Sequence, residues 1–154
     1  MRLPRPAVLS AAVLALAALA AGLPAQADQA SSGSAGVFQA SINAARAQAG
    51  LATLSVDPVL TAAAQAYAVE MAQTGRVSHV GADGSQLQDR AWRAGCGGGW
   101  MAENLAWGQD STEDVFVGWM SSPSHNVNMM GPNYRVYGLA QANGMWVMML
   151  ADGC

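Results

Sequence analysis

Residues 136–151 read VYGLAQANGMWVMMLA, and this stretch decides the fold class. Two apolar runs, 136–142 and 145–151, flank the dipeptide Asn143-Gly144. An Asn-Gly pair between two apolar runs is the strongest short-range signal of a β-hairpin, because both residues tolerate the positive φ angles of a type I′ turn. The sequence therefore predicts two antiparallel strands joined by this dipeptide.

Upstream of the hairpin, apolar residues recur at the spacing of helices. Residues 58–74 carry the clearest signal, since Asp57 suits the N-cap, Pro58 the first helical position and Gly75 the end. Another helix is predicted over residues 38–49. The apolar positions that define the two faces are Leu60, Ala64, Tyr67 and Met71 in one helix and Phe38, Ile42, Ala45 and Ala49 in the other.

Three shorter helices are predicted between these segments and the hairpin. The first opens at Ser85, whose spacing from Gln88 is that of a capping box. The second opens at residues 111–114 and the third at Ser122-Pro123, while residues 100–107 predict a short strand. The expected buried face of the second helix is Val115, Phe116, Trp119 and Met120. Helices followed by a small antiparallel sheet indicate an α+β fold in which helices cover the sheet.

The N-terminal residues predict export. Residues 1–27 combine Arg2 and Arg5, an Ala/Leu run and Ala25-Gln26-Ala27, which together are typical of a cleaved signal peptide. A membrane anchor is the alternative, but the cleavage pattern favours removal. Residues 28–36 are small and polar and predict a flexible leader, so the domain is expected over residues 37–154. No later apolar run is long enough to span a membrane, and we expect a secreted or periplasmic monomer.

Composition excludes several functions. The 154 residues suit one domain, and all seven basic residues are arginines, so a P-loop lysine or a Schiff-base lysine is excluded. A formal net charge of −3 without a basic stretch argues against nucleic-acid binding. The sequence also lacks the G-x-S-x-G pattern of a serine nucleophile.

Cys96 and Cys154 are the only cysteines. In an exported chain two cysteines favour a disulfide, because the compartment is oxidising. The alternative is a reactive or metal-binding thiol pair, which would require both sulfurs to stay reduced.

Three residues are candidates for a site. His79 and His125 are the only histidines, and their spacing is not that of a helical zinc pair, so surface or capping roles are the alternative. Glu103 shares one side of the predicted strand with Met101 and Leu105. A carboxylate on a buried side needs a partner. The partner could be a backbone cluster or an Arg, or else an imidazole or a metal, and an exposed edge is the third interpretation.

Four stretches together resemble one family. They are Asn43-Ala-Ala-Arg46 with Gly50-Leu51, then His79, then Ala102-Glu-Asn-Leu-Ala106, and Trp119-Met-Ser-Ser-Pro-Ser-His125-Asn-Val-Asn128. In this order they resemble the CAP superfamily (cysteine-rich secretory protein, antigen 5 and pathogenesis-related 1, also called SCP domains), in its short bacterial branch. The resemblance covers residues 37–152 and implies an α-β-α sandwich. It also implies a cleft in which His79, Glu103 and His125 converge, in some members with a divalent metal such as zinc on the two histidines.

The chain departs from the family pattern at two places. Larger members carry a second glutamate where this chain has Trp119-Met-Ser-Ser122, and Glu113 and Asp114 lie a turn or two earlier. Bacterial members often have Gly-His-Arg where this chain has Ser124-His125-Asn126. These departures make the site less acidic and less cationic than the family pattern.

The resemblance implies two functions. The first is a non-enzymatic secreted module that binds an unidentified ligand, such as a lipid or an envelope component. The alternative is a metal-dependent hydrolase, in which His79 and His125 hold a metal-bound water and Glu103 acts as general base. Two imidazoles make a weak, open zinc site and the sequence shows no third ligand, so we favour the binding module over an enzyme.

Overall fold

The computed structural model describes residues 26–154. Residues 1–25 of the predicted signal peptide lie outside the described residues. Among residues 26–154, no helix combines the length and the apolar character that crossing a membrane requires.

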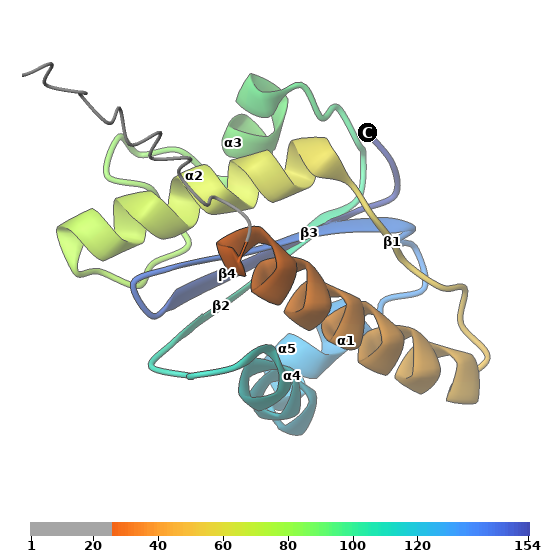
Figure 1. Ribbon diagram of the computed structural model, residues 1–154. Helices are drawn as coiled ribbons and strands as arrows, with labels where there is room; N and C mark the ends of the chain where they lie inside the picture. The colour runs from red at the N-terminus through yellow and green to blue at the C-terminus, as the bar shows by residue number, and fades with distance from the viewer. Residues whose placement is uncertain (1–25) are drawn as a thin grey trace, which may run out of the picture.

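The centre of the fold is a four-stranded sheet of order β1-β3-β4-β2 (Figure 1). Its strands are β1 (Ser55–Val56), β2 (Met101–Trp107), β3 (Val136–Ala142) and β4 (Met145–Ala151). β1 pairs with β3 in parallel, and the other pairings are antiparallel. The turn residues Asn143 and Gly144 have φ angles of 46° and 80°, as a type I′ turn requires. The predicted hairpin is therefore confirmed.

Helices cover both faces of this sheet, which confirms the predicted α-β-α sandwich. In Figure 1, α2 and α3 lie on one side of the strands, and α1, α4 and α5 lie on the other. Two separate groups of buried apolar side chains fill these two layers. The helices are α1 (Gln26–Gln48), α2 (Pro58–Thr74), α3 (Leu87–Ala94), α4 (Thr112–Ser121) and α5 (Pro123–Met129).

The α2 helix has the ends that the sequence predicts. The side chain of Asp57 accepts hydrogen bonds from the backbone N–H groups of Val59 and Leu60 at 2.8 and 2.9 Å, and Gly75 ends the helix with a left-handed conformation. Gly138 in β3 lets this helix approach the sheet, because a Cβ there would lie 2.2 Å from the backbone of Leu60. The predicted apolar positions Leu60, Ala64, Tyr67 and Met71 are all buried.

Two helices begin at residues other than those predicted. α1 begins at Gln26 and includes residues 28–36, which we expected to be a flexible leader. Adding residues to an existing helix gains one hydrogen bond each, so a helix can extend beyond its packed part. The N-cap of α3 is Gln86 rather than Ser85, and its backbone N–H donates to Oδ2 of Asp89 at 2.9 Å.

The family motif around residues 43–46 has a structural role. Asn43 donates to and accepts from the backbone of Leu54, over 2.9 and 2.7 Å. The sequence predicted that Ala49 lies on the buried face of this helix, but Ala49 is exposed. Arg46 is buried instead. The Arg46 guanidinium donates to the carbonyl oxygens of Ala52, Met129 and Gly131 at 2.7, 2.7 and 3.0 Å. These bonds tie the end of α1 to the end of α5.

Two further predictions about the core hold. Cys96 and Cys154 form a disulfide, which joins the end of α3 to the residues after β4. Val115 and Trp119 of α4 are buried, and Phe116 and Met120 are partly buried against them. The predicted buried face of this helix is therefore confirmed.

Candidate functional site

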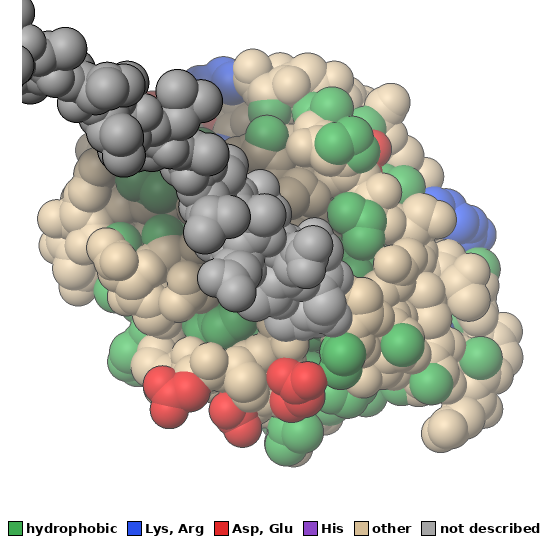
Figure 2. Space-filling model, viewed as in Figure 1, with side chains coloured by type: hydrophobic (Ala, Val, Ile, Leu, Met, Phe, Trp, Pro, Cys, Tyr) green, Lys and Arg blue, Asp and Glu red, His purple; other side chains and the backbone are tan. Residues whose placement is uncertain are grey.

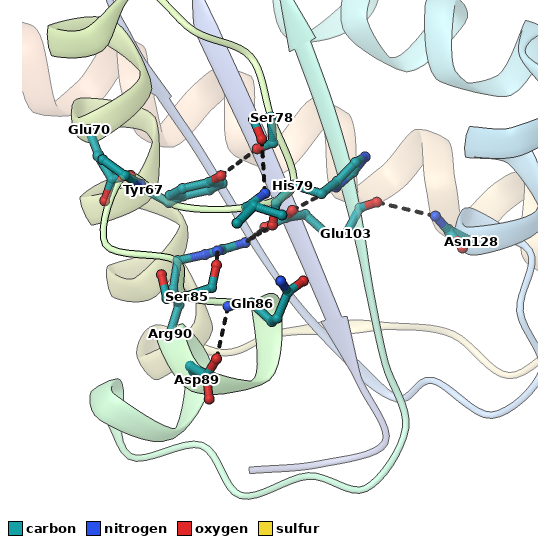
Figure 3. Close-up of polar contacts among 12 residues, drawn as sticks. Tyr67, Glu70, Ser78, His79, Ser85, Gln86, Asp89, Arg90, Glu103 and Asn128 are labelled. Carbon is teal, nitrogen blue, oxygen red and sulfur yellow. Dashed lines mark hydrogen bonds and ion pairs between the residues drawn. The ribbon is translucent and has the colours of Figure 1, made fainter.

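Glu103 is the centre of the candidate site. It lies on β2, at the edge of the sheet, and its side chain is buried on the α2–α3 side (Figure 3). Oε2 accepts a hydrogen bond from Nη2 of Arg90 at 2.7 Å, and Oε1 lies 2.8 Å from Nδ1 of His79. Since a carboxylate accepts, Nδ1 of His79 is the donor. The sequence left the partner of Glu103 open, and the structure supplies both an Arg and an imidazole.

Arg90 is held by more than the carboxylate. Its Nη1 donates to the carbonyl oxygen of Ser85 at 2.8 Å, and its Nη2 also donates to that of His79 at 3.3 Å. The guanidinium carbon lies 3.6 Å from the centre of the Tyr67 ring, a stacked cation–π arrangement. Arg90 therefore links α3, the loop before it and the α2 helix around Glu103.

Tyr67 fixes the loop that carries His79. Its hydroxyl donates to the carbonyl oxygen of Ser78 (Figure 3). Burial raises the pKa of this phenol. His79 follows directly in the chain, and its side chain is 63% exposed. Its Nε2 has no protein partner within residues 35–154. The imidazole of His79 is therefore exposed to solvent, while its Nδ1 is fixed by the hydrogen bond to Glu103.

His125 lies on the other side of the edge strand. Its Nδ1 is 2.9 Å from the hydroxyl of Ser122, and its carbonyl oxygen accepts a hydrogen bond from the side chain of Asn104 at 3.0 Å. Asn128 donates to the carbonyl oxygen of Glu103 and to Oδ1 of Asn104, at 3.2 and 2.9 Å. These bonds dock α5 against β2. Burial lowers the pKa of His125, and the charge of His79 lowers it further.

The structure thus joins two of the three predicted site residues. His79 and Glu103 are in contact, whereas His125 bonds to neither of them in the part of the chain that the structure describes. The three residues nevertheless border the same strand, because the α5 helix of His125 is anchored on the backbone of Glu103 through Asn128.

Glu113 and Asp114 do not supply the missing second glutamate. Both are exposed in the first turn of α4. Glu113 accepts a hydrogen bond from the hydroxyl of Thr112 at 3.0 Å, and Asp114 from that of Ser111 at 2.6 Å. Figure 2 shows acidic side chains gathered at the α4 side of one face of the molecule. These carboxylates serve the start of a helix and stand apart from Glu103.

The predicted metal ligands fit a zinc ion only in part. Each histidine has its Nδ1 bonded to an oxygen and its Nε2 without a protein partner in the described part, which is how metal-binding imidazoles are usually oriented. However, both oxygens of Glu103 are already bonded, and residues 35–154 hold no group of three His, Cys, Asp or Glu side chains suited to a metal. Zinc sites use at least three protein ligands, so these residues do not form a complete one.

Sequence reasoning missed Arg90, Tyr67 and Asn104. No pattern links Arg90 or Tyr67 to Glu103, because the three residues come from separate elements and meet only through the tertiary packing. Asn104 lies inside the quoted motif, and its position next to Glu103 on a strand indicates that it faces the opposite side. That alternation would have been a usable signal for a second polar cluster.

Comparison with known proteins agrees with this fold. The sequence profile of the cysteine-rich secretory protein family (CAP) matches residues 39–145. The protein named "Uncharacterized protein YkwD" from Bacillus subtilis is 28% identical over 106 residues, which are 68% of this chain and 41% of YkwD. The chain therefore spans about two fifths of that relative's length.

Solved structures show the same architecture. An extracellular protein containing a SCP domain from Bacillus anthracis superposes with a TM-score of 0.71 at 20% identity, over 74% of this chain and 38% of that one. An outer surface protein from Borrelia burgdorferi gives a TM-score of 0.70 at 18% identity, over 86% and 97% of the two chains. The fold agrees with both, and the family profile covers more than half of the chain. The chain therefore belongs to the cysteine-rich secretory protein (CAP) family.

Proposed function

We propose that this protein is an exported, non-enzymatic binding module. Its ligand, a lipid or another envelope component, is held at the outer edge of β2 by His79 and His125, with Glu103 beneath them. We call these three residues the His–Glu–His surface. His79 is well exposed and His125 partly exposed, so both imidazoles are accessible to a ligand. Export is supported by the predicted signal peptide and by relatives whose names describe extracellular and outer surface proteins.

The observation that carries this proposal is the double engagement of Glu103. Arg90 and His79 occupy its two carboxylate oxygens, at 2.7 and 2.8 Å, in a buried setting. A general base must be within hydrogen-bond reach of the proton that it removes. Glu103 would have to give up one of these bonds to act on a water. The carboxylate is therefore suited to hold Arg90 and orient His79, which supports binding rather than hydrolysis.

The proposal is tested by co-sedimentation of the mature chain with purified cell-wall sacculi and, separately, with vesicles of bacterial lipid. We expect the wild type to sediment with one of them, and the double variant His79→Ala/His125→Ala to stay in solution. Arg93→Ala is the control, because it removes an exposed ion pair with Asp83 and leaves the three residues of this surface unchanged.

Two outcomes would overturn the proposal. One is equal sedimentation of the wild type and the double histidine variant, or none by either. The other is turnover of ester or peptide substrates that Glu103→Gln abolishes while the protein stays folded, which would establish the hydrolase instead.

A further inference from the structure

The hydrogen bond between His79 and Glu103 determines which ring nitrogen of His79 carries the proton. Nδ1 lies 2.8 Å from Oε1 of Glu103, and a carboxylate only accepts, so the proton is on Nδ1. A neutral imidazole has one N–H group, and the hydrogen bond made by one nitrogen decides the state of the other. Nε2 of His79 is therefore a hydrogen-bond acceptor, on a side chain that is 63% exposed.

Glu103 keeps its direction because Arg90 holds its other oxygen. Nη2 of Arg90 donates to Oε2 at 2.7 Å, and the two side chains are 7% and 3% exposed. Nη1 of Arg90 donates to the carbonyl oxygen of Ser85 at 2.8 Å, while the guanidinium carbon lies 3.6 Å from the centre of the Tyr67 ring. A planar guanidinium bonds in several directions while it stacks, and a lysine ammonium does not. Arg90 thus fixes the carboxylate that fixes the imidazole.

The backbone of His79 is held by the same two residues. The hydroxyl of Tyr67 donates to the carbonyl oxygen of Ser78, and Nη2 of Arg90 donates to that of His79 at 3.3 Å. Figure 3 shows these side chains and Glu103 in one continuous cluster. Because the backbone and the ring of His79 are both held, its Nε2 keeps one direction.

The charges around this cluster disfavour an anionic ligand. The positive charge of Arg90 is balanced by Glu103, and both are buried. Residues 28–154 contain ten acidic side chains and five arginines, so the exported domain is negative overall and repels anions. Arg76, three residues before His79, is the exposed cation that an anion bound at this loop would use.

We infer that His79 binds its ligand as a hydrogen-bond acceptor, and that Arg90 and Tyr67 are the positioning residues that impose this role. The ligand group at His79 is therefore a neutral donor, a hydroxyl or an amide N–H. Such donors occur in the glycan of the cell wall and in the headgroups of glycolipids. The inference rests on the proposed function, because it names the ligand chemistry at the His79 end of the His–Glu–His surface.

The tautomer of His79 is measured without any ligand. Nitrogen-15 NMR of the mature chain distinguishes a protonated ring nitrogen from an unprotonated one, at about pH 8.5, which is about two units above the ordinary pKa of histidine. We expect the proton on Nδ1, whereas a free neutral histidine in water carries it mainly on Nε2. Arg90→Lys should raise the share of the Nε2–H form, and Arg93→Ala on the same helix should leave it unchanged.

Tyr67→Phe is the second positioning variant, and it removes a single hydroxyl. It should also raise the share of the Nε2–H form, because the loop of His79 loses its bond at Ser78. This variant keeps the inference falsifiable if Arg90→Lys does not fold. The thermal melt of each variant shows whether it is folded.

Two changes of His79 separate an acceptor from a charge. His79→Gln keeps a neutral side chain with a carbonyl acceptor, whereas His79→Arg replaces the acceptor by cationic donors. Binding is measured by co-sedimentation with cell-wall sacculi and, separately, with neutral glycolipid vesicles, each with and without EDTA. We expect binding to one of them, a loss of about ten-fold or more in His79→Arg, and a smaller loss in His79→Gln. Arg76→Ala is the control and should bind as the wild type does.

Three results would overturn the inference. The first is a proton on Nε2, or on both ring nitrogens, of His79 in the wild type, or a tautomer that no positioning variant changes. The second is a His79→Arg protein that binds as well as the wild type, or a loss of binding in Arg76→Ala, as an anionic ligand would require. The third is binding that EDTA abolishes, because a metal ion would then lie between His79 and the ligand.

The failure of this inference is distinguishable from that of the proposed function. Co-sedimentation that the double histidine variant loses and His79→Arg keeps defeats only the acceptor role. The expected tautomer without any co-sedimentation defeats the envelope ligand, while the positioning role of Arg90 and Tyr67 stands.

Discussion

Glu103 and Arg90 form an ion pair at 2.7 Å in which both side chains are removed from solvent, with 3% and 7% of their surfaces exposed. Such a pair is expensive to break, because the remaining charge stays buried without its partner. The same carboxylate orients His79. The orientation of the exposed imidazole therefore depends on an ion pair that is itself buried.

Glu103→Gln should lower the free energy of unfolding by about 3–5 kcal/mol, the usual cost of removing one partner of a buried pair. Urea unfolding measures this loss. Arg93→Ala is the matched control, since it breaks an ion pair of 2.6 Å with Asp83 that is largely exposed, and it should have a much smaller effect. Similar losses in the two variants would contradict the buried character of the Glu103–Arg90 pair.

Acidification should destabilise the protein through His125. Burial and the charge of His79 lower the pKa of His125 below its usual 6.5, so the folded state favours the neutral ring. The unfolded chain therefore takes up the proton first as pH falls. The stabilisation is fully present above about pH 6.5 and is lost as pH falls toward the folded pKa.

Unfolding free energies measured in steps from about pH 7.5 to about pH 5 test this linkage. His125→Gln should flatten the pH dependence in that window relative to the wild type. Identical pH slopes for the two proteins would mean that His125 titrates alike in the folded and unfolded states.

Removal of the disulfide should cost stability through the unfolded chain. Cys96 and Cys154 are 58 residues apart, and closing a loop of that length is worth about 4 kcal/mol in the chain-entropy model. The double variant Cys96→Ala/Cys154→Ala should therefore unfold at lower urea concentration, by up to that amount. A double variant as stable as the wild type would show that the bond adds nothing to stability.

Trp119→Ala should cost about 3–5 kcal/mol, because this side chain is buried and its Nε1 donates to the carbonyl oxygen of Leu105 at 3.1 Å. The melting temperature measures the effect. Trp92→Ala is the control, since Trp92 is 61% exposed on α3 and should tolerate truncation. Equal melting temperatures of the two variants would place Trp119 outside the core.

Gly118→Ala should raise the free energy of unfolding by about 0.5–1 kcal/mol, because alanine loses less chain entropy in a helix and its methyl group meets no atom. Urea unfolding of the pair of proteins measures the gain. A destabilised Gly118→Ala protein would show that the packing around α4 requires a glycine at this position.

Elements with local signals could be predicted from the sequence. The bounds of α2 follow from Asp57, Pro58 and Gly75, and the hairpin follows from Asn143-Gly144, since these residues act on their own backbone. The start of α1 could not be predicted in this way, because the small polar residues 28–36 carry no helical apolar pattern.

The candidate site, too, could be predicted from the sequence only in part. Strand alternation places Glu103 on a buried side with Leu105 and therefore predicts that it needs a partner. The choice of Arg90 depends on how α3 packs over the edge of the sheet, which no short pattern encodes. The separation of His125 from Glu103 likewise depends on α5 docking on the opposite side of β2.

The position of β4 determines when the chain can fold. β4 follows the other strands in sequence, yet it lies inside the sheet between β3 and β2, which do not pair with each other. A growing chain therefore cannot complete the sheet until residue 151 has been synthesised, and contacts of such long range form late. Until then β2 and β3 have no strand between them, so the helices have no complete sheet to pack against.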